Sequence, residues 1–278
     1  DDADDEPLSP TDGLTRWSLT RALLDFGEGN ASGERDLLRA RGQLPPGALG
    51  DEALRNAHAQ ADALRPAVQE FTRGASMLPI ATLRVEWEDG TRLEGAPADP
   101  YPNGVLHVRP GEIDGRHVLR AWLDALLCAA AGVDRRVMLV GLDKEKQACS
   151  FWLPRLPQDR ACEQLRALIE LSIQGRRTPL PFFVRTSWDH ALACAGAERN
   201  AADSAREVDL DVFEKAAKVP EGNNGLGGPG EFESDAVRIV WRGRDLPGPA
   251  DGALAQDLHR TALAVFAQPA HAWAEQFE

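Results

Sequence analysis

The sequence predicts a mixed α/β (α+β) fold in which a small central sheet is flanked by helices. Apolar residues recur at helical spacing near both ends of the chain, over 14–71 and over Leu254–Phe277. Between them lie pairs of short β-prone runs that flank charged turns, at Asp89-Gly90 and at 143–146. A helical pattern separates the two pairs, so strands and helices belong to one mixed architecture.

The N-terminal part is expected to be helical after a short linker. Residues 1–13 are acidic and contain proline, which predicts a solvated linker, and the folded domain is expected over 14–278. A chain that opens on such a run resembles a piece cut from a longer polypeptide. The helical pattern of 14–71 is interrupted at Gly42–Gly50, which contains Pro45-Pro46, so two helical parts are expected.

Three strands are expected next. An Asp-Gly turn between β-prone runs predicts a hairpin of Ala81–Trp87 with Arg92–Gly95. A third strand, Val105–Arg109, follows a turn at 99–104.

The rest of the chain alternates between helical, strand and loop patterns, and we find no internal repeat in it. The sequence first predicts a helix that begins at Asp114-Gly115 and ends at Gly132, then a hairpin of Val137–Val140 with Ala148–Leu153, and then a helix capped by Asp159 and ended by Gly175. An apolar loop over Pro179–Trp188 and a polar helix over Asp189–Lys218 are expected next. The last expected elements are a connection at Gly222–Gly230, a strand at Ala236–Trp241 and a terminal helix over Leu254–Phe277.

The charge of the chain argues against autonomous binding of nucleic acid. The formal net charge is -13, whereas proteins that bind DNA nonspecifically gain most of their affinity from lysines and arginines that neutralise phosphates. The central third is the exception, because residues 84–185 carry 15 basic and 14 acidic side chains. Only this part of the chain is expected to face phosphate.

The cysteines and the hydropathy predict a reducing, cytoplasmic location. No signal peptide precedes the predicted core, and no apolar run is long enough to span a membrane. The cysteines form no Cys-x-x-Cys pair and lie in apolar runs, which is typical of buried free thiols: Cys128, Cys149, Cys162 and Cys194.

The third strand and the segment before it have the frame of a nuclease metal site with the wrong residues in it. Enzymes of the RecB nuclease type carry Gly-x-x-Asp on one strand and, on the next, two hydrophobic residues, Asp, a hydrophobic residue and Lys. Counted from Gly95, the two Asp positions hold Ala98 and His107, and the Lys position holds Arg109. Residues i and i+2 of a strand share a face, so an imidazole and a guanidinium would stand where Mg²⁺ needs oxygen ligands. We therefore expect no metal and no catalysis, and a hydrogen-bonded structural role for His107.

An active Mg²⁺-dependent DNA nuclease is the alternative. It would use Asp99, one residue beyond the expected position, together with Glu112 or Asp114, and Glu94 is a further carboxylate close by. Asp99 would face away from the site if the strand pleat continued there. The other histidines of the chain show no metal-ligand spacing: His58, His117, His190, His259 and His271.

Several segments together resemble the C-terminal domain of RecC, the gamma subunit of exodeoxyribonuclease V, which is the bacterial RecBCD helicase-nuclease. The most specific are Val108-Arg109-Pro110-Gly111 and the Ala-Trp-Leu helix at Val118–Leu126. Further matching segments, in order, are Asp12-Gly13-Leu14 with Leu23-Leu24, Arg41–Gly47, Leu180–Phe183, Thr186-Ser187-Trp188 and Gly227–Glu231. The resemblance covers nearly the whole chain, without the two helicase-like domains that precede this region in the family.

The resemblance implies a restriction-endonuclease-like, RecB-nuclease-like fold that has lost catalysis. It implies the RecB and RecD subunits as partners, and a duplex DNA end in the context of the complex. The ATP and Mg²⁺ of that complex belong to other subunits, so no cofactor is expected on this chain. In the family this region supports the assembly, and a protruding hairpin helps to separate the strands of the duplex.

The hairpin around Asp89-Gly90 is our candidate for that wedge, with Arg84, Trp87 and Arg92 as candidate DNA-binding residues. An aromatic side chain near a hairpin tip can stack on a base, although packing within the hairpin is the favoured use of Trp87. The tip is acidic, which favours steric splitting over phosphate contact.

Binding to RecD is expected at the apolar loop or at the terminal helix. In the loop, the candidate partner-binding residues are Phe182, Phe183 and Trp188.

Overall fold

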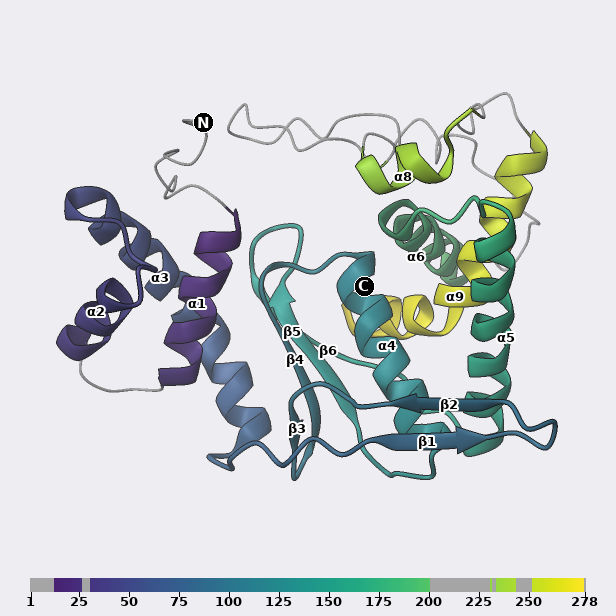
Figure 1. Ribbon diagram of the computed structural model, residues 1–278, viewed down its shortest axis with the longest axis horizontal. Helices are drawn as coiled ribbons and strands as arrows, with labels where there is room; N and C mark the ends of the chain where they lie inside the picture. The colour runs from purple at the N-terminus through teal and green to yellow at the C-terminus, as the bar shows by residue number, and fades with distance from the viewer. Residues whose placement is uncertain (1–12, 27–30, 201–230, 232–233, 244–251, 278) are drawn as a thin grey trace, which may run out of the picture.

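The computed structural model describes residues 13–26, 31–200, 231, 234–243 and 252–277 (Figure 1). Its elements in chain order are α1 (Gly13–Phe26), α2 (Ala31–Ala40), α3 (Gly47–Thr72), β1 (Leu83–Glu86), β2 (Arg92–Gly95), β3 (Pro100–Tyr101), β4 (Gly104–Glu112), α4 (Gly115–Ala130), β5 (Val137–Leu142), β6 (Ala148–Trp152), α5 (Gln158–Arg177), α6 (Val184–Asn200), α8 (Asp235–Val240) and α9 (Gly252–Phe277). The expected linker up to residue 12, the expected helix beyond residue 200 and the connection at Gly222–Gly230 lie outside the described residues. No helix within the described ranges has the length and apolar character needed to cross a bilayer.

The central sheet has four strands in the order β3-β4-β5-β6. β4 and β5 are parallel, with His107 opposite Leu139, and the other neighbouring pairs are antiparallel. Parallel neighbours need a crossover connection, and α4 provides it. All six residues of β5 are buried, because helices cover both faces of the sheet. A mixed architecture with a small sheet flanked by helices is therefore confirmed.

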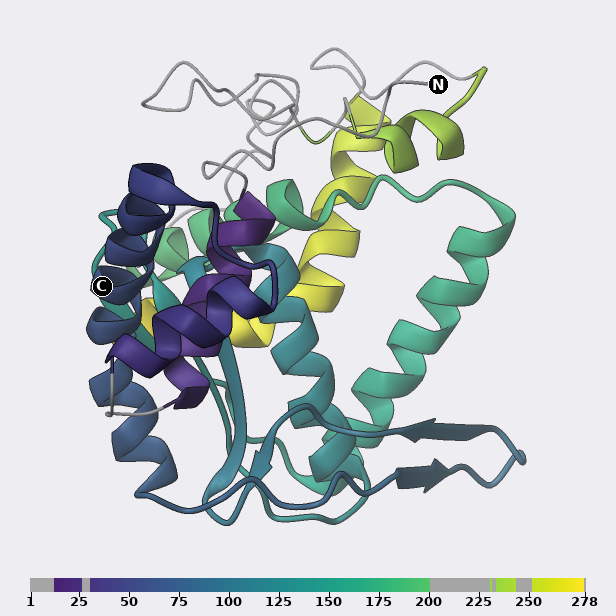
Figure 2. The same ribbon diagram turned by 60° about the vertical axis from the view of Figure 1, so that its left-hand side comes forward.

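Helices from the two ends of the chain cover opposite faces of this sheet (Figures 1 and 2). On the face covered by α3, Leu64 and Phe71 pack against every second strand residue: Leu106, Met138, Val140 and Leu142. On the face covered by α4, Trp122 and Leu126 share a core with Val105, Val137 and Leu139. The alternation of β4 thus directs its odd-numbered residues toward α4, and His107 is one of them.

β1 and β2 form the expected hairpin, but as a separate two-stranded sheet at the edge of the molecule (Figures 1 and 2). Val85 is buried in the α4-side core, and Trp87 is half-buried against the same core. Asp89 at the tip forms an ion pair with Arg166 of α5. The hairpin is therefore held at its middle and at its tip by the α4-side layer.

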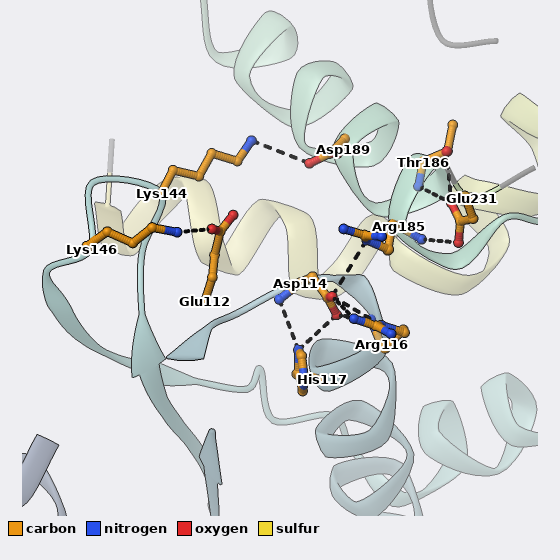
Figure 3. Close-up of polar contacts among 10 residues, drawn as sticks. All are labelled: Glu112, Asp114, Arg116, His117, Lys144, Lys146, Arg185, Thr186, Asp189 and Glu231. Carbon is orange, nitrogen blue, oxygen red and sulfur yellow. Dashed lines mark hydrogen bonds and ion pairs between the residues drawn. The ribbon is translucent and has the colours of Figure 1, made fainter. Parts of the chain in front are cut away.

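α6 begins inside the segment that was expected to be an apolar loop, and the loop prediction is wrong from Val184 onward. Glu231 lies 45 residues after Thr186 in the sequence. Its carboxylate accepts hydrogen bonds from the backbone nitrogens of Arg185 and Thr186, both at 2.9 Å, and from the Thr186 hydroxyl (Figure 3). The first N–H groups of a helix have no partner within the helix, and a carboxylate satisfies them. No local pattern indicates so distant a partner.

The boundaries of α5 also differ from the prediction. The helix begins at Gln158 after Pro157, so Asp159 lies in the first turn and is not the cap. The helix then continues through Gly175 and ends at Arg177. A glycine lowers helix stability by only about 1 kcal/mol, which is not enough to end this helix.

Two short elements were assigned the wrong type. Ala236–Trp241 was expected as a strand, but Asp235–Val240 forms the helix α8, and Ser234 Oγ accepts from the backbone nitrogen of Val237 at its start. Pro100–Tyr101 was expected within a turn and pairs with β4 as β3. Runs this short are below the length at which periodicity distinguishes a helix from a strand.

α4 begins at Asp114, as expected. The Asp114 carboxylate accepts from the backbone nitrogen of Arg116, and the His117 ring accepts from the backbone nitrogen of Asp114 (Figure 3). The Arg116 guanidinium lies 2.6 Å from the carboxylate. Burial raises the pKa of Asp114, but hydrogen bonds with His117 and Arg116 outweigh burial and hold the pKa well below its usual range.

Asp114 should make the stability of the protein depend on pH. A depressed folded-state pKa adds stability above the unfolded value of about 3.9, and this stability is lost as the pH falls through the folded value. Asp114→Ala should lower the free energy of unfolding at pH 7 by about 1 kcal/mol. Its difference from the wild type should shrink below pH 4 in urea titrations.

Asp114→Asn is the matched control, because asparagine caps helices well but carries no charge. It should be less stable than the wild type at pH 7, because it keeps the cap but lacks the charge-dependent component, and the two proteins should approach equal stability as the pH falls below 4. A wild-type minus Asp114→Asn difference that grows as the pH falls below 4 would contradict the assignment.

Gly115 allows α4 to approach α6 closely. A Cβ atom on Gly115 would lie 2.4 Å from the Val184 carbonyl oxygen and 2.6 Å from Trp188 Cβ. Gly115→Ala should therefore lower the free energy of unfolding by about 1–3 kcal/mol, measured by chemical denaturation. Gly175→Ala is the control, since its Cβ would meet the flexible end of Leu180 at 3.3 Å and should leave stability unchanged or slightly higher. Equal losses in the two variants would refute the close-packing argument.

Candidate functional site

Ala98 and His107, which occupy the carboxylate positions of the nuclease frame, converge on a single carboxylate of α4. The backbone nitrogen of Ala98 donates to Asp124 Oδ2 at 2.9 Å, and His107 Nε2 lies 2.9 Å from the same oxygen. The side chains of His107 and Asp124 are only 9% and 15% exposed. The prediction of a hydrogen-bonded strand histidine at 107 is confirmed.

Asp124 is the site residue that sequence reasoning missed. Its apolar neighbour Leu123 is 39% exposed, whereas Asp124 contacts β4. Asp124 is the only charged residue between Arg120 and Asp134. A single charge in an apolar helical stretch is the signal that could have identified it, because a buried carboxylate needs hydrogen-bond partners.

This arrangement provides few oxygen ligands for a divalent cation. Mg²⁺ requires near-octahedral oxygen coordination, with carboxylates as the protein ligands. Asp124 provides one carboxylate, and one of its two oxygens already has two hydrogen-bond partners. Within the described ranges, no group of three possible ligand residues forms around Asp124 and His107.

Arg109 holds the third position of the frame. Among the described residues, no hydrogen bond links it to the Asp124 cluster. The register of β4 shifts between Val108 and Glu112, which carries Arg109 out of the regular pleat. Its Nε atom is buried without a hydrogen-bond partner among the described residues. Burial lowers the pKa of Arg109, while the carboxylate of Asp114 acts in the opposite direction.

The carboxylates of the alternative nuclease site each pair with a basic group. Asp99 has a positive φ of 33° and forms an ion pair with Arg21 of α1 at 2.7 Å. Glu112 pairs with Lys146, and Asp114 is the cap of α4 (Figure 3). The structure therefore does not assemble these three carboxylates into one metal site within the described ranges.

The candidate DNA-binding arginines of the hairpin also have partners. Arg84 lies 2.8 Å from Glu94, and Arg92 lies 3.3 Å from Glu86. These pairs are exposed and contribute little to stability, yet they neutralise the charge that would attract phosphate. Glu94, the remaining carboxylate of the alternative site, is thus engaged within the hairpin.

The three candidate partner-binding residues pack largely inside this chain. Phe183 and Trp188 are 2% and 3% exposed, and Phe182 is half-buried and stacks on Phe266 at 5.9 Å. Trp188 meets the same ring edge-on at 5.4 Å. Phe182 and Trp188 therefore pack where α6 meets α9, whereas the Phe183 ring lies 6.1 Å from that of Trp241, just after α8. Phe183 and Trp188 have almost no area left for a partner.

Comparisons with known proteins show likeness to RecC. The family model described as RecC C-terminal domain matches residues 1–195. The chain is 27% identical over 255 residues to the RecBCD enzyme subunit RecC of Mycobacterium tuberculosis (strain ATCC 25618 / H37Rv), covering 87% of this chain and 21% of that protein. It is 28% identical over 193 residues to the RecBCD enzyme subunit RecC of Mycolicibacterium smegmatis (strain ATCC 700084 / mc(2)155), covering 66% of this chain and 17% of that protein.

The chain thus spans about a fifth of the length of the curated relatives that it matches. The family match includes the hairpin, the β4 strand with its altered motif, and α4 with Asp124. The chain belongs to the RecC C-terminal domain family.

Proposed function

We propose that this chain is a non-catalytic, nuclease-like domain of a cytoplasmic RecBCD-type helicase-nuclease. In this role it supports the assembly of a RecC-type subunit with RecB and RecD subunits, and it assists strand separation at a duplex DNA end during double-strand-break repair by homologous recombination. The ATP and Mg²⁺ of that complex act on the other subunits. The observation that carries the proposal is the convergence of Ala98 and His107 on Asp124.

The hydrogen bonds at Asp124 support a structural role for the altered motif. In an active site of this kind, carboxylates from neighbouring segments would share a metal ion. Here a backbone amide and an imidazole contact the one carboxylate directly, so these segments are joined without an ion. These contacts hold β4 against α4 and engage the Asp124 carboxylate in hydrogen bonds.

The charge distribution supports a role within an assembly over one as an independent DNA-binding protein. The net charge is -13, and the arginines of the hairpin pair with glutamates across it. When such a surface binds DNA, few counterions are released, so the free energy of binding gains little from them. A hairpin fixed at Val85 and at Asp89 is suited to separate strands sterically once other subunits move the DNA.

The purified protein should not degrade linear duplex DNA with Mg²⁺ or Mn²⁺, because no carboxylate group is positioned to hold the ion. Release of acid-soluble nucleotides should equal that of a metal-free control. Asp99→Ala should behave as the wild type, and Asp124→Asn serves as a second test, of the carboxylate that contacts Ala98 and His107. Metal-dependent digestion that disappears in Asp99→Ala would establish the alternative, an active nuclease, and overturn the proposal.

A charge exchange in the hairpin separates steric splitting from phosphate contact. Arg84→Glu combined with Glu94→Arg keeps the cross-strand ion pair and moves the positive charge to the other strand. In a reconstituted complex with RecB and RecD, steric splitting predicts unwinding rates within about 2-fold of the wild type, since the pair keeps the hairpin rigid.

Shortening the hairpin tip, residues 88–91, should slow unwinding in the same assay without changing the affinity for a DNA end. Loss of DNA affinity in the charge exchange, with a shallower dependence on salt, would show instead that Arg84 binds phosphate.

A further inference from the structure

The packing of α6 on α9 brings together three side chains that commonly bind metals. His190 and Cys194 are four residues apart on α6 and therefore share a helix face, and His259 lies on α9. One ligand atom from each residue lies within 4.8 Å of the other two. His190 is buried, with 4% exposure, and Cys194 and His259 are half-buried. This cluster has no part in the Asp124 site or in the proposed function.

The distances between the donor atoms are close to those of a tetrahedral zinc site. Zinc-ligand bonds of roughly 2.0–2.3 Å at tetrahedral angles place two nitrogens roughly 3.3 Å apart and a nitrogen and a sulfur roughly 3.5 Å apart. Cys194 Sγ lies 3.6 Å from His190 Nε2, and His190 Nε2 lies 2.9 Å from His259 Nδ1. Both distances lie within roughly half an ångström of these values.

The short distance between the two imidazole nitrogens has a definite chemical meaning. Two unprotonated ring nitrogens repel each other at 2.9 Å, so one of them must donate a proton to the other. A metal ion can lie between the two nitrogens and accept both lone pairs when the donating ring carries its proton on its other nitrogen, and the Cys194 thiol releases its proton to solvent as it becomes the third ligand. We propose that His190, Cys194 and His259 form a zinc-binding site that links α6 to α9.

The donor set favours zinc over other biological cations. Two imidazoles and a thiolate suit Zn²⁺, whereas Mg²⁺ and Ca²⁺ require oxygen ligands. A copper site of the His₂Cys type also uses a weak axial methionine. Met138 lies on the α3 face of the central sheet and Met77 is 49% exposed ahead of β1, so neither methionine of the chain belongs to the cluster. A water molecule completes the four-coordinate zinc site.

The position of the cluster gives zinc a structural consequence. α6 and α9 also meet through Trp188 and Phe266, whose rings are 5.4 Å apart, and Ala191 and Ala195 are buried in the same core. A metal bond between His259 and the α6 ligands adds a cross-link between segments 69 residues apart in sequence. Because zinc binds the folded protein in preference to the unfolded chain, it should raise the Tm.

Titration of the purified, chelator-treated protein with Zn²⁺ alone tests the proposal. Calorimetry should show one equivalent bound, and the Tm should rise by several degrees until that equivalent is reached. Co²⁺ as a spectroscopic probe should give a thiolate-to-cobalt charge-transfer band and the intense visible bands of tetrahedral coordination. Cys194→Ser should weaken zinc binding at least about 100-fold and abolish the charge-transfer band, since serine is a poor ligand for zinc.

Cys162→Ser is the matched control, because Cys162 is a half-buried thiol on α5 outside the cluster. It should bind zinc as the wild type does. If Cys194→Ser does not fold, alkylation of the wild type provides the test: zinc should protect Cys194 and leave the reactivity of Cys162 unchanged. Absence of zinc binding by the wild type, equal zinc affinity of Cys194→Ser, or a cobalt spectrum without the thiolate band would overturn the proposal.

Discussion

The buried carboxylate of Asp124 joins three parts of the fold. Its Oδ2 atom accepts a hydrogen bond from the segment after the hairpin, through Ala98, and contacts His107 on the central strand β4. A buried polar group without a partner costs about 1–3 kcal/mol, so each of the three groups requires the other two. This mutual requirement fixes the position of α4 against β4. Because α4 connects β4 to β5, it also fixes the position of β5.

The need for hydrogen-bond partners also explains the positions of two carboxylates at the starts of helices. Asp114 satisfies the first turn of α4, and Glu231 satisfies the first turn of α6 from a distant segment. Around these points the arginines pair with acids of this chain, as in the hairpin pairs of Arg84 and Arg92. These arginines are therefore paired with acids of this chain, and the net charge of -13 disfavours direct attraction of DNA.

Local sequence signals predicted the elements whose structure depends on near neighbours. The Asp89-Gly90 turn, the Asp114 cap and the alternation of β4 all appear as expected. The start of α6 was missed because its capping carboxylate comes from Glu231, and α8 was missed because a six-residue apolar run fits a strand as well as a helix. The separation of the hairpin from the central sheet has no local signal at all.

For the candidate site, the sequence by itself determined which side chains stand at positions 98, 107 and 109, namely Ala98, His107 and Arg109, and their chemistry led to the expectation that no metal binds there. Strand alternation also predicted that His107 and Arg109 share a face, but the register shift of β4 between Val108 and Glu112 carries Arg109 out of that pleat. Only the tertiary structure decided what these residues contact: Asp124 lies 17 residues after His107, and His259 lies 69 residues after His190. Such pairings depend on how helices pack on a sheet, and packing is a property of the assembled core that no local spacing of residues specifies.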